Sequence, residues 1–162
     1  MEKIDYENLN ELLSSHLQKD GKVSVYSPRV DANLINGTPS FNATWSWWGF
    51  IAGWTFFLYR KMYLVAAVFF VLSIISTAIP FGGFILAIIT GASSFYFYTI
   101  KFHNDLISSG YGQRDIEDVK IDLKKLGGYN SWVVFVAVVF YSLLIVFSII
   151  PAITAIFATA IF

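Results

Sequence analysis

Residues 62–100 read MYLVAAVFFVLSIISTAIPFGGFILAIITGASSFYFYTI and contain no Asp, Glu, Lys or Arg. An uncharged apolar run predicts membrane-spanning helices, because a hydrocarbon core of about 30 Å takes about 20 residues at a rise of about 1.5 Å each. The run is interrupted at Pro80–Gly83, where a proline and two glycines permit a tight reversal of the chain. We therefore expect two transmembrane helices, at residues 62–79 and 84–100, joined as a hairpin.

A second stretch without charge covers residues 126–162. It predicts a third transmembrane helix at residues 132–150, which we expect Pro151 to interrupt because proline removes a backbone donor. Residues 152–162 are too few to cross a membrane again. They either extend the helix beyond a kink or lie at the far interface.

The composition points to the same class of protein. The chain is 56% hydrophobic, 19% aromatic and only 14% charged, whereas soluble domains carry about 25% charged residues. Its 11 basic and 11 acidic residues cancel, so the chain lacks the basic surface of a nucleic-acid-binding protein. It has no cysteine, which excludes disulfides, thiolate metal sites and thiol catalysis. Residues 1–20 are acidic and mixed, so we expect no signal peptide.

Residues 41–59 are uncharged but unusually rich in aromatic side chains. Trp and Tyr prefer the headgroup level of a bilayer, so this segment either spans the membrane or lies in, or re-enters, one leaflet. If it does not span, every Lys and Arg lies on the cytoplasmic side together with the N-terminal tail, as the positive-inside rule favours. We expect an all-α integral membrane protein with about three transmembrane helices plus this interfacial or re-entrant segment. Four spans are the alternative.

The N-terminal tail carries an amphipathic helix with Gly21 as its expected stop. The apolar face of this helix is formed by Leu9, Leu12, Leu13, His16 and Leu17. Residues 22–26 alternate like a short strand, and Asn36–Gly37 marks a turn.

A second amphipathic helix is expected in the loop before the last transmembrane helix. Asp115 is a suitable N-cap for it, and Gly127 follows its last turn. Its apolar face is formed by Ile116, Val119, Leu123 and Leu126. We expect the apolar faces of the tail helix and the loop helix to pack on each other or on a partner.

These expectations divide the chain into four segments. Residues 1–40 are a cytoplasmic tail with an amphipathic helix, and residues 41–100 are the aromatic segment and the transmembrane hairpin. Residues 101–131 form a cytoplasmic amphipathic loop, in which we place His103 and Asp105. Residues 132–162 form the C-terminal transmembrane helix with its proline-interrupted end.

Two runs in the aromatic segment form a motif. They are Ser46-Trp47-Trp48-Gly49-Phe50-Ile51-Ala52-Gly53 and Tyr59-Arg60-Lys61-Met62-Tyr63. The runs resemble a family of small bacterial inner-membrane proteins known as a domain of unknown function (the DUF2628 type). The resemblance covers about residues 45–100 and implies a multi-pass protein of the bacterial inner (cytoplasmic) membrane. It implies no reaction.

Arg60 and Lys61 are the leading candidates for a binding site. Trp54, Tyr59 and Tyr63 lie close to them in the sequence, and aromatic rings stack on a guanidinium. The group is therefore a candidate site for anionic lipid headgroups or for an acidic partner. The alternative is an anchor, in which the two basic side chains only set the orientation of the following helix.

Small residues at a spacing of four predict close helix packing. The pairs are Gly49 with Gly53 and Ala87 with Gly91. They indicate either a homo-oligomer or contacts between the helices of one chain, and the sequence leaves both open.

Three functions compete. The first is a small membrane scaffold or accessory subunit of a membrane complex. The second is a homo-oligomeric channel or permease subunit lined by hydroxyl side chains, and the third is a membrane enzyme that acts on lipid. The hydroxyl side chains of the second are Ser73, Ser76, Thr77, Thr90, Ser93, Ser94 and Thr99. We find no catalytic constellation, so we expect no enzyme and no cofactor.

Overall fold

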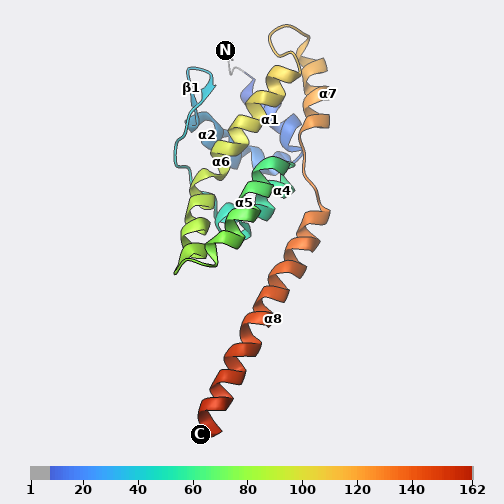
Figure 1. Ribbon diagram of the computed structural model, residues 1–162. Coiled ribbons are helices and arrows are strands. Elements are labelled where there is room, and N and C mark those ends of the chain that lie inside the picture. The colour runs from blue at the N-terminus through green and yellow to red at the C-terminus, as the bar shows by residue number, and fades with distance from the viewer. Residues whose placement is uncertain (1–7, 162) are drawn as a thin grey trace. The chain divides into compact units, whose positions relative to one another are not determined.

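The computed structural model describes the backbone of residues 8–161 and the side chains of residues 8–147, 149 and 150. The chain is mostly helical (73%), which confirms the all-α class. It divides into two units, Met1–Asn130 and Ser131–Phe162. Figure 1 shows that the long helix α6 (Gly82–Ser108) runs the length of the first unit, with different partners along it.

One end of the first unit is polar and is built by the two predicted amphipathic helices. The tail helix α1 (Leu9–Leu17) packs against the loop helix α7 (Ile116–Leu126), which confirms the expected contact between them. Their interface contains Leu12, Leu13 and Leu123, all fully buried. The Asp115 carboxylate accepts a hydrogen bond from the Glu117 N–H at 2.9 Å, which confirms the predicted N-cap.

The segment after α1 differs from the prediction. Gln18, with φ 53°, ends α1 before Gly21, which lies in the short 3₁₀ helix η1 (Asp20–Lys22). The strand predicted at residues 22–26 is wrong, because the chain forms helix α2 (Val23–Ala32) there. A helix places Tyr26 and Val30, four residues apart, on one face, and both are buried.

The predicted turn at Asn36–Gly37 joins two short strands. β1 (Leu34–Ile35) pairs antiparallel with β2 (Thr38–Pro39). Asn36 and Gly37 have φ 52° and 81°, and a two-residue hairpin loop with two positive φ values favours this Asn-Gly sequence.

The aromatic segment forms two short helices. They are α3 (Trp47–Ala52) and α4 (Trp54–Tyr59), separated at Gly53, where φ is 54°. The Ser46 side chain caps α3 by accepting from the Gly49 N–H at 3.0 Å. Each helix has 6 residues, or about 9 Å of rise, and is far shorter than a membrane span.

The hairpin helices are α5 (Tyr63–Ser76) and α6, and the chain reverses in the predicted turn at Pro80–Gly83. α6 does not end at residue 100 but continues to Ser108, so His103 and Asp105 are helical and not part of a loop. Among the described residues, α6 is the one helix long and apolar enough to cross a membrane, a test that core helices of soluble proteins also pass.

The second unit is helix α8 (Trp132–Ile161). The predicted end of this helix near residue 150 is wrong, because the helix continues through Pro151 to Ile161. Of the two alternatives for the last residues, the extension of the helix is confirmed.

Candidate functional site

Arg60 lies at the C-terminal end of α4 and is buried, with 4% of its surface exposed. Its Nε–H donates to the Tyr26 hydroxyl at 3.0 Å. Its guanidinium carbon lies 4.7 Å from the centroid of the Tyr26 ring, 5.4 Å from that of Tyr59 and 5.9 Å from that of Tyr98. Three tyrosine rings from α2, α4 and α6 therefore surround this cation, and their π faces attract it.

The ring partners of Arg60 are only partly those expected. Tyr59 is confirmed as a neighbour, but Tyr26 and Tyr98 take the places we gave to Trp54 and Tyr63. Trp54 packs edge-to-face on Phe70, with ring centroids 5.0 Å apart. Tyr63 is exposed, and its hydroxyl accepts from the Asn130 amide at 3.1 Å. Arg60 thus lies inside the protein and not at an exposed surface as an interfacial anchor does.

Two lysines, Lys19 and Lys61, are held by neutral partners. The Lys19 amine donates to the Tyr59 hydroxyl at 2.7 Å and lies 4.0 Å from the centroid of the Tyr129 ring. Lys61 adopts a φ of 59°, and its amine donates to the Gly127 carbonyl at 2.6 Å. Lys61 is thus held by the segment after α7 and follows Arg60 in the chain, whereas Lys19 and Arg60 both contact Tyr59. We call Lys19, Arg60 and Lys61, together with Tyr59, the cationic cluster.

A second polar group is buried between α1 and α6. The His16 ring contacts the Tyr98 hydroxyl through Nδ1 at 2.7 Å and the Asp105 carboxylate through Nε2 at 2.8 Å. A carboxylate can only accept, so Nε2 carries the proton and Nδ1 accepts from Tyr98. The Lys101 amine donates to the same Asp105 oxygen at 2.6 Å. Tyr98 therefore joins this network to the ring cage around Arg60.

Burial sets the protonation states of the groups that α1 and α2 contribute. It lowers the pKa of His16 below its ordinary value near 6.5, and the hydrogen bond and charge of Asp105 oppose this shift. Burial also raises the pKa of Tyr26, against the charge of Arg60. Both groups are thus neutral near pH 7, and Arg60 receives no negative charge from the tyrosine that it contacts.

His16 and its partners were not identified as a site from the sequence. His16 does stand on the apolar face of α1, and a histidine at such a position is a signal of a buried polar contact. Lys19, Tyr26, Tyr98 and Asp105 gave no comparable signal. They reach the site from separate elements, so no local spacing joins them.

The predicted packing glycines serve contacts within this chain. A Cβ added at Gly49 would collide with the Ser94 hydroxyl of α6, and one added at Gly91 would lie 3.0 Å from the Trp45 ring. The Ser46 N–H also donates to the Gly91 carbonyl at 2.8 Å. Gly53 ends α3 with its positive φ, and Ala87 is half-buried. Gly49 and Gly91 thus let α3 approach α6 closely.

The hydroxyl groups considered as a pore lining bond within their own helices. Each donates to a carbonyl three or four residues earlier, at 2.5–2.8 Å. Thr90, Ser93, Ser94 and Thr99 are also buried. The hydroxyl protons are therefore already donated to backbone carbonyls of the same chain. In the part of the chain that the structure describes, no group of three or more His, Cys, Asp or Glu residues could hold a metal ion.

Comparison with known proteins gives no match, either to a family model, to a curated protein or to a solved structure. The resemblance of residues 46–53 and 59–63 to the small bacterial membrane family stays a prediction from the motif. The function of the site is therefore argued from its geometry alone.

Proposed function

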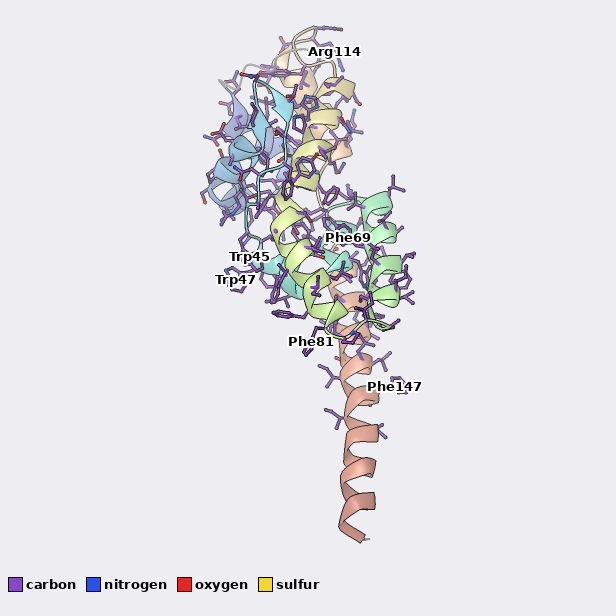
Figure 2. All side chains as sticks on the ribbon, turned by 60° about the vertical axis from the view of Figure 1, so that its left-hand side comes forward. Trp45, Trp47, Phe69, Phe81, Arg114 and Phe147 are labelled. Atoms are coloured by element: carbon purple, nitrogen blue, oxygen red, sulfur yellow. The ribbon has the colours of Figure 1, made fainter. Side chains whose placement is uncertain are left out.

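We propose that this chain is a small multi-pass protein of the bacterial inner membrane that acts as a scaffold or accessory subunit, with its N-terminal tail in the cytoplasm. The observation that carries the proposal is the separation of charge from exposed apolar surface along the first unit. Figure 2 shows the two extremes, with Arg114 at one end of this unit and Phe81 at the other.

The apolar end is formed by α5, the turn and the first half of α6. Residues 62–100 carry no charge, and Phe81 at the turn is 83% exposed. Other large apolar side chains of this end that are exposed are Leu64, Val68, Val71, Ile74, Ile75, Ile79, Phe84, Ile85, Ile88 and Ile89. Soluble proteins rarely expose this many large apolar side chains at one end. In a bilayer, lipid tails would cover these side chains and keep them away from water.

The lengths of α6 and α8 fit a bilayer. From Gly82 at the turn to Tyr98 beside Arg60, α6 rises about 24 Å, close to the hydrocarbon thickness of about 30 Å. The helix α8 has 30 residues and no charged side chain, and it is about 45 Å long. α6 and α8 are therefore long enough to span, whereas the second arm of the hairpin, α5, has 14 residues and rises only about 21 Å.

The tryptophans of α3 support an interfacial position for the aromatic segment. Trp47 and Trp48 are 67% and 69% exposed. Exposed tryptophans favour the headgroup level. Because α3 and α4 are too short to cross, we place residues 41–59 in one leaflet, so that every Lys and Arg shares the cytoplasmic side.

The polar end supports the role of scaffold. The apolar faces of α1 and α7 cover each other, so their charged faces point outward. Lys124 and Lys125 on α7 are exposed. A preformed, charged helical surface at the membrane is suited to hold a partner subunit through complementary charge.

Cysteine labelling tests the topology, because the chain has no cysteine of its own. Gly21, Gly83 and Gln113 are exposed, and a Cβ at Gly21 or Gly83 meets no other atom. We expect an impermeant thiol reagent to label Gly83→Cys in intact cells. Gly21→Cys and Gln113→Cys should react only after lysis. Labelling of either of these two in intact cells would contradict the topology.

Purification in mild detergent tests the role of scaffold. We expect the protein to co-purify with another membrane protein at a fixed ratio. The double substitution Lys124→Glu and Lys125→Glu should release that partner without loss of the fold. A homo-oligomer without a partner that conducts ions in liposomes would instead support the channel alternative.

A further inference from the structure

Arg60 has more hydrogen-bond donors than partners. Nε–H donates to Tyr26, but Nη1 is buried and has no acceptor within the part of the chain that the structure describes. Buried polar groups are nearly always hydrogen-bonded, and buried charges are nearly always paired. The three tyrosine rings attract the cation, but they leave this donor unsatisfied.

The neighbouring cations also have no counter-ion among the described residues. Lys19 and Lys61 donate to a tyrosine hydroxyl and a backbone carbonyl, both neutral. Over residues 8–147, no Asp or Glu forms an ion pair with any of the three cations of the cluster. Lys101 and Lys120, by contrast, each contact a carboxylate within 3 Å. The cationic cluster therefore concentrates positive charge that the described protein does not neutralise.

We propose that the cationic cluster binds a phosphate group. A phosphate carries up to two negative charges, and its oxygens match the planar fork of a guanidinium. One oxygen would accept from Nη1 of Arg60, and another would replace the Tyr59 hydroxyl as the acceptor for the Lys19 amine. Lys19, Tyr59 and Lys61 are half-buried and Arg60 is buried, so an incoming ligand reaches the first three before Arg60.

A phosphate can be supplied by a free phosphorylated compound or by a lipid headgroup, and the chemistry at Arg60 is the same. The full-length protein in dodecyl maltoside micelles, which contain no phosphate, separates the two sources. Titration with inorganic phosphate at constant ionic strength should raise the melting temperature in a saturable way if the ligand is free. If the ligand is a headgroup, only the addition of phosphatidylglycerol to the micelles should give the increase.

Substitution of Arg60 tests whether the phosphate binds at the cationic cluster. Arg60→Lys keeps the positive charge but loses the planar guanidinium. We expect it to bind whichever phosphate source stabilises the wild type about tenfold more weakly. The control is Arg114→Lys. Arg114 lies outside the cationic cluster and pairs with Asp122, so this variant should bind phosphate as the wild type does. If Arg60→Lys does not fold, Lys19→Gln should still fold and bind more weakly than the control.

Two results would overturn the proposal. One is no stabilisation in either arm. The other is equal stabilisation of wild type, Arg60→Lys and Lys19→Gln, which would leave Arg60 with a structural role only.

Discussion

The two halves of α6 have nearly opposite surroundings. In the half that begins at Gly82, α3 and α5 pack on the helix, and its exposed side chains are large and apolar. In the half that ends at Ser108, α1, α2 and α7 approach the helix, and it contributes Tyr98, Lys101 and Asp105 to buried or half-buried hydrogen bonds. One helix thus combines an exposed apolar face at one end with a covered polar network at the other.

This difference explains why composition alone gives an incomplete description of α6. Its mean hydropathy is high enough for a membrane span, yet one face of its last turns, with Phe102, His103 and Leu106, is packed inside the polar end. A polar group inside a protein needs a covering layer that supplies partners, whereas an apolar surface needs only lipid or another apolar surface. The first polar side-chain contact of α6 with another element of the polar end is made by Tyr98, and this is where we place the membrane boundary.

The largest expected effect comes from one substitution made at both ends of α6. Ile88 and Ile107 are 41% and 50% exposed, respectively. At Ile88, a lysine would face hydrocarbon, and we expect a cost of about 3–4 kcal/mol for insertion. At Ile107 it would face water, and the effect should stay within about 0.5 kcal/mol. For each variant, insertion is measured as the membrane fraction that resists carbonate extraction, and stability as the melting temperature in nanodiscs.

Equal tolerance of Ile88→Lys and Ile107→Lys would mean that both ends of α6 face water. The apolar end would then be an ordinary exposed surface or a contact with another protein. The comparison is sharp because helix, residue type and replacement are the same.

The first unit was largely predictable where its signals are local. The apolar face of α1, the Asp115 cap of α7 and the turn at Pro80–Gly83 follow from the spacing of neighbouring residues, and all three are confirmed. Local spacing fails for α2, because five alternating residues are too few to decide between strand and helix when burial against α6 favours a helix.

The binding site was predictable only in part, for a related reason. Arg60 was identified from its sequence neighbours, but its contacts with Tyr26 and Tyr98 span α2, α4 and α6. No pattern within one element reports such a long-range contact. The sequence therefore predicted an important arginine and missed that it is buried.

The second effect tests whether the α1–α7 interface stabilises the polar end. Leu123 is fully buried on the inner face of α7, and Leu123→Asp would place a carboxylate there. We expect a loss of about 2–4 kcal/mol in the free energy of unfolding. The control is Ile121→Asp on the exposed face of the same helix, which should change stability by at most about 0.5 kcal/mol. Similar melting temperatures for the two variants in detergent would contradict the interface.

A third, smaller effect is expected where α3 meets α6, between the two halves. Gly49→Ala places a Cβ against the Ser94 side chain, 3.1 Å from the Thr90 carbonyl oxygen, and should cost about 1–3 kcal/mol. Gly83→Ala, at the apolar end of α6, meets no atom within 4 Å. It should leave stability unchanged or increase it by up to about 1 kcal/mol. Thermal unfolding of both variants measures this contact, and a neutral Gly49→Ala would show that α3 can move away from α6.

The smallest effect is a pH dependence of the polar end. The buried His16 is surrounded by Tyr98 and Asp105, with Lys101 and Arg60 nearby, and burial lowers its pKa. The unfolded chain takes up a proton on His16 near pH 6.5, and the folded protein resists it until a lower pH. The folded protein is therefore fully stabilised above about pH 6.5 and loses stability as the pH falls below that value.

One such group changes the free energy of unfolding by at most about 1.4 kcal/mol per pH unit. Carboxylates also titrate in acid, so the quantity to measure is the difference between wild type and His16→Gln from about pH 7.5 to 5. We expect the stability of the wild type to fall more steeply than that of the variant. The opposite slope would mean that an imidazolium paired with Asp105 is more stable inside the protein than a neutral ring. The charge of Asp105 would then outweigh the cost of burying a cation, even with Lys101 bound to the same carboxylate oxygen.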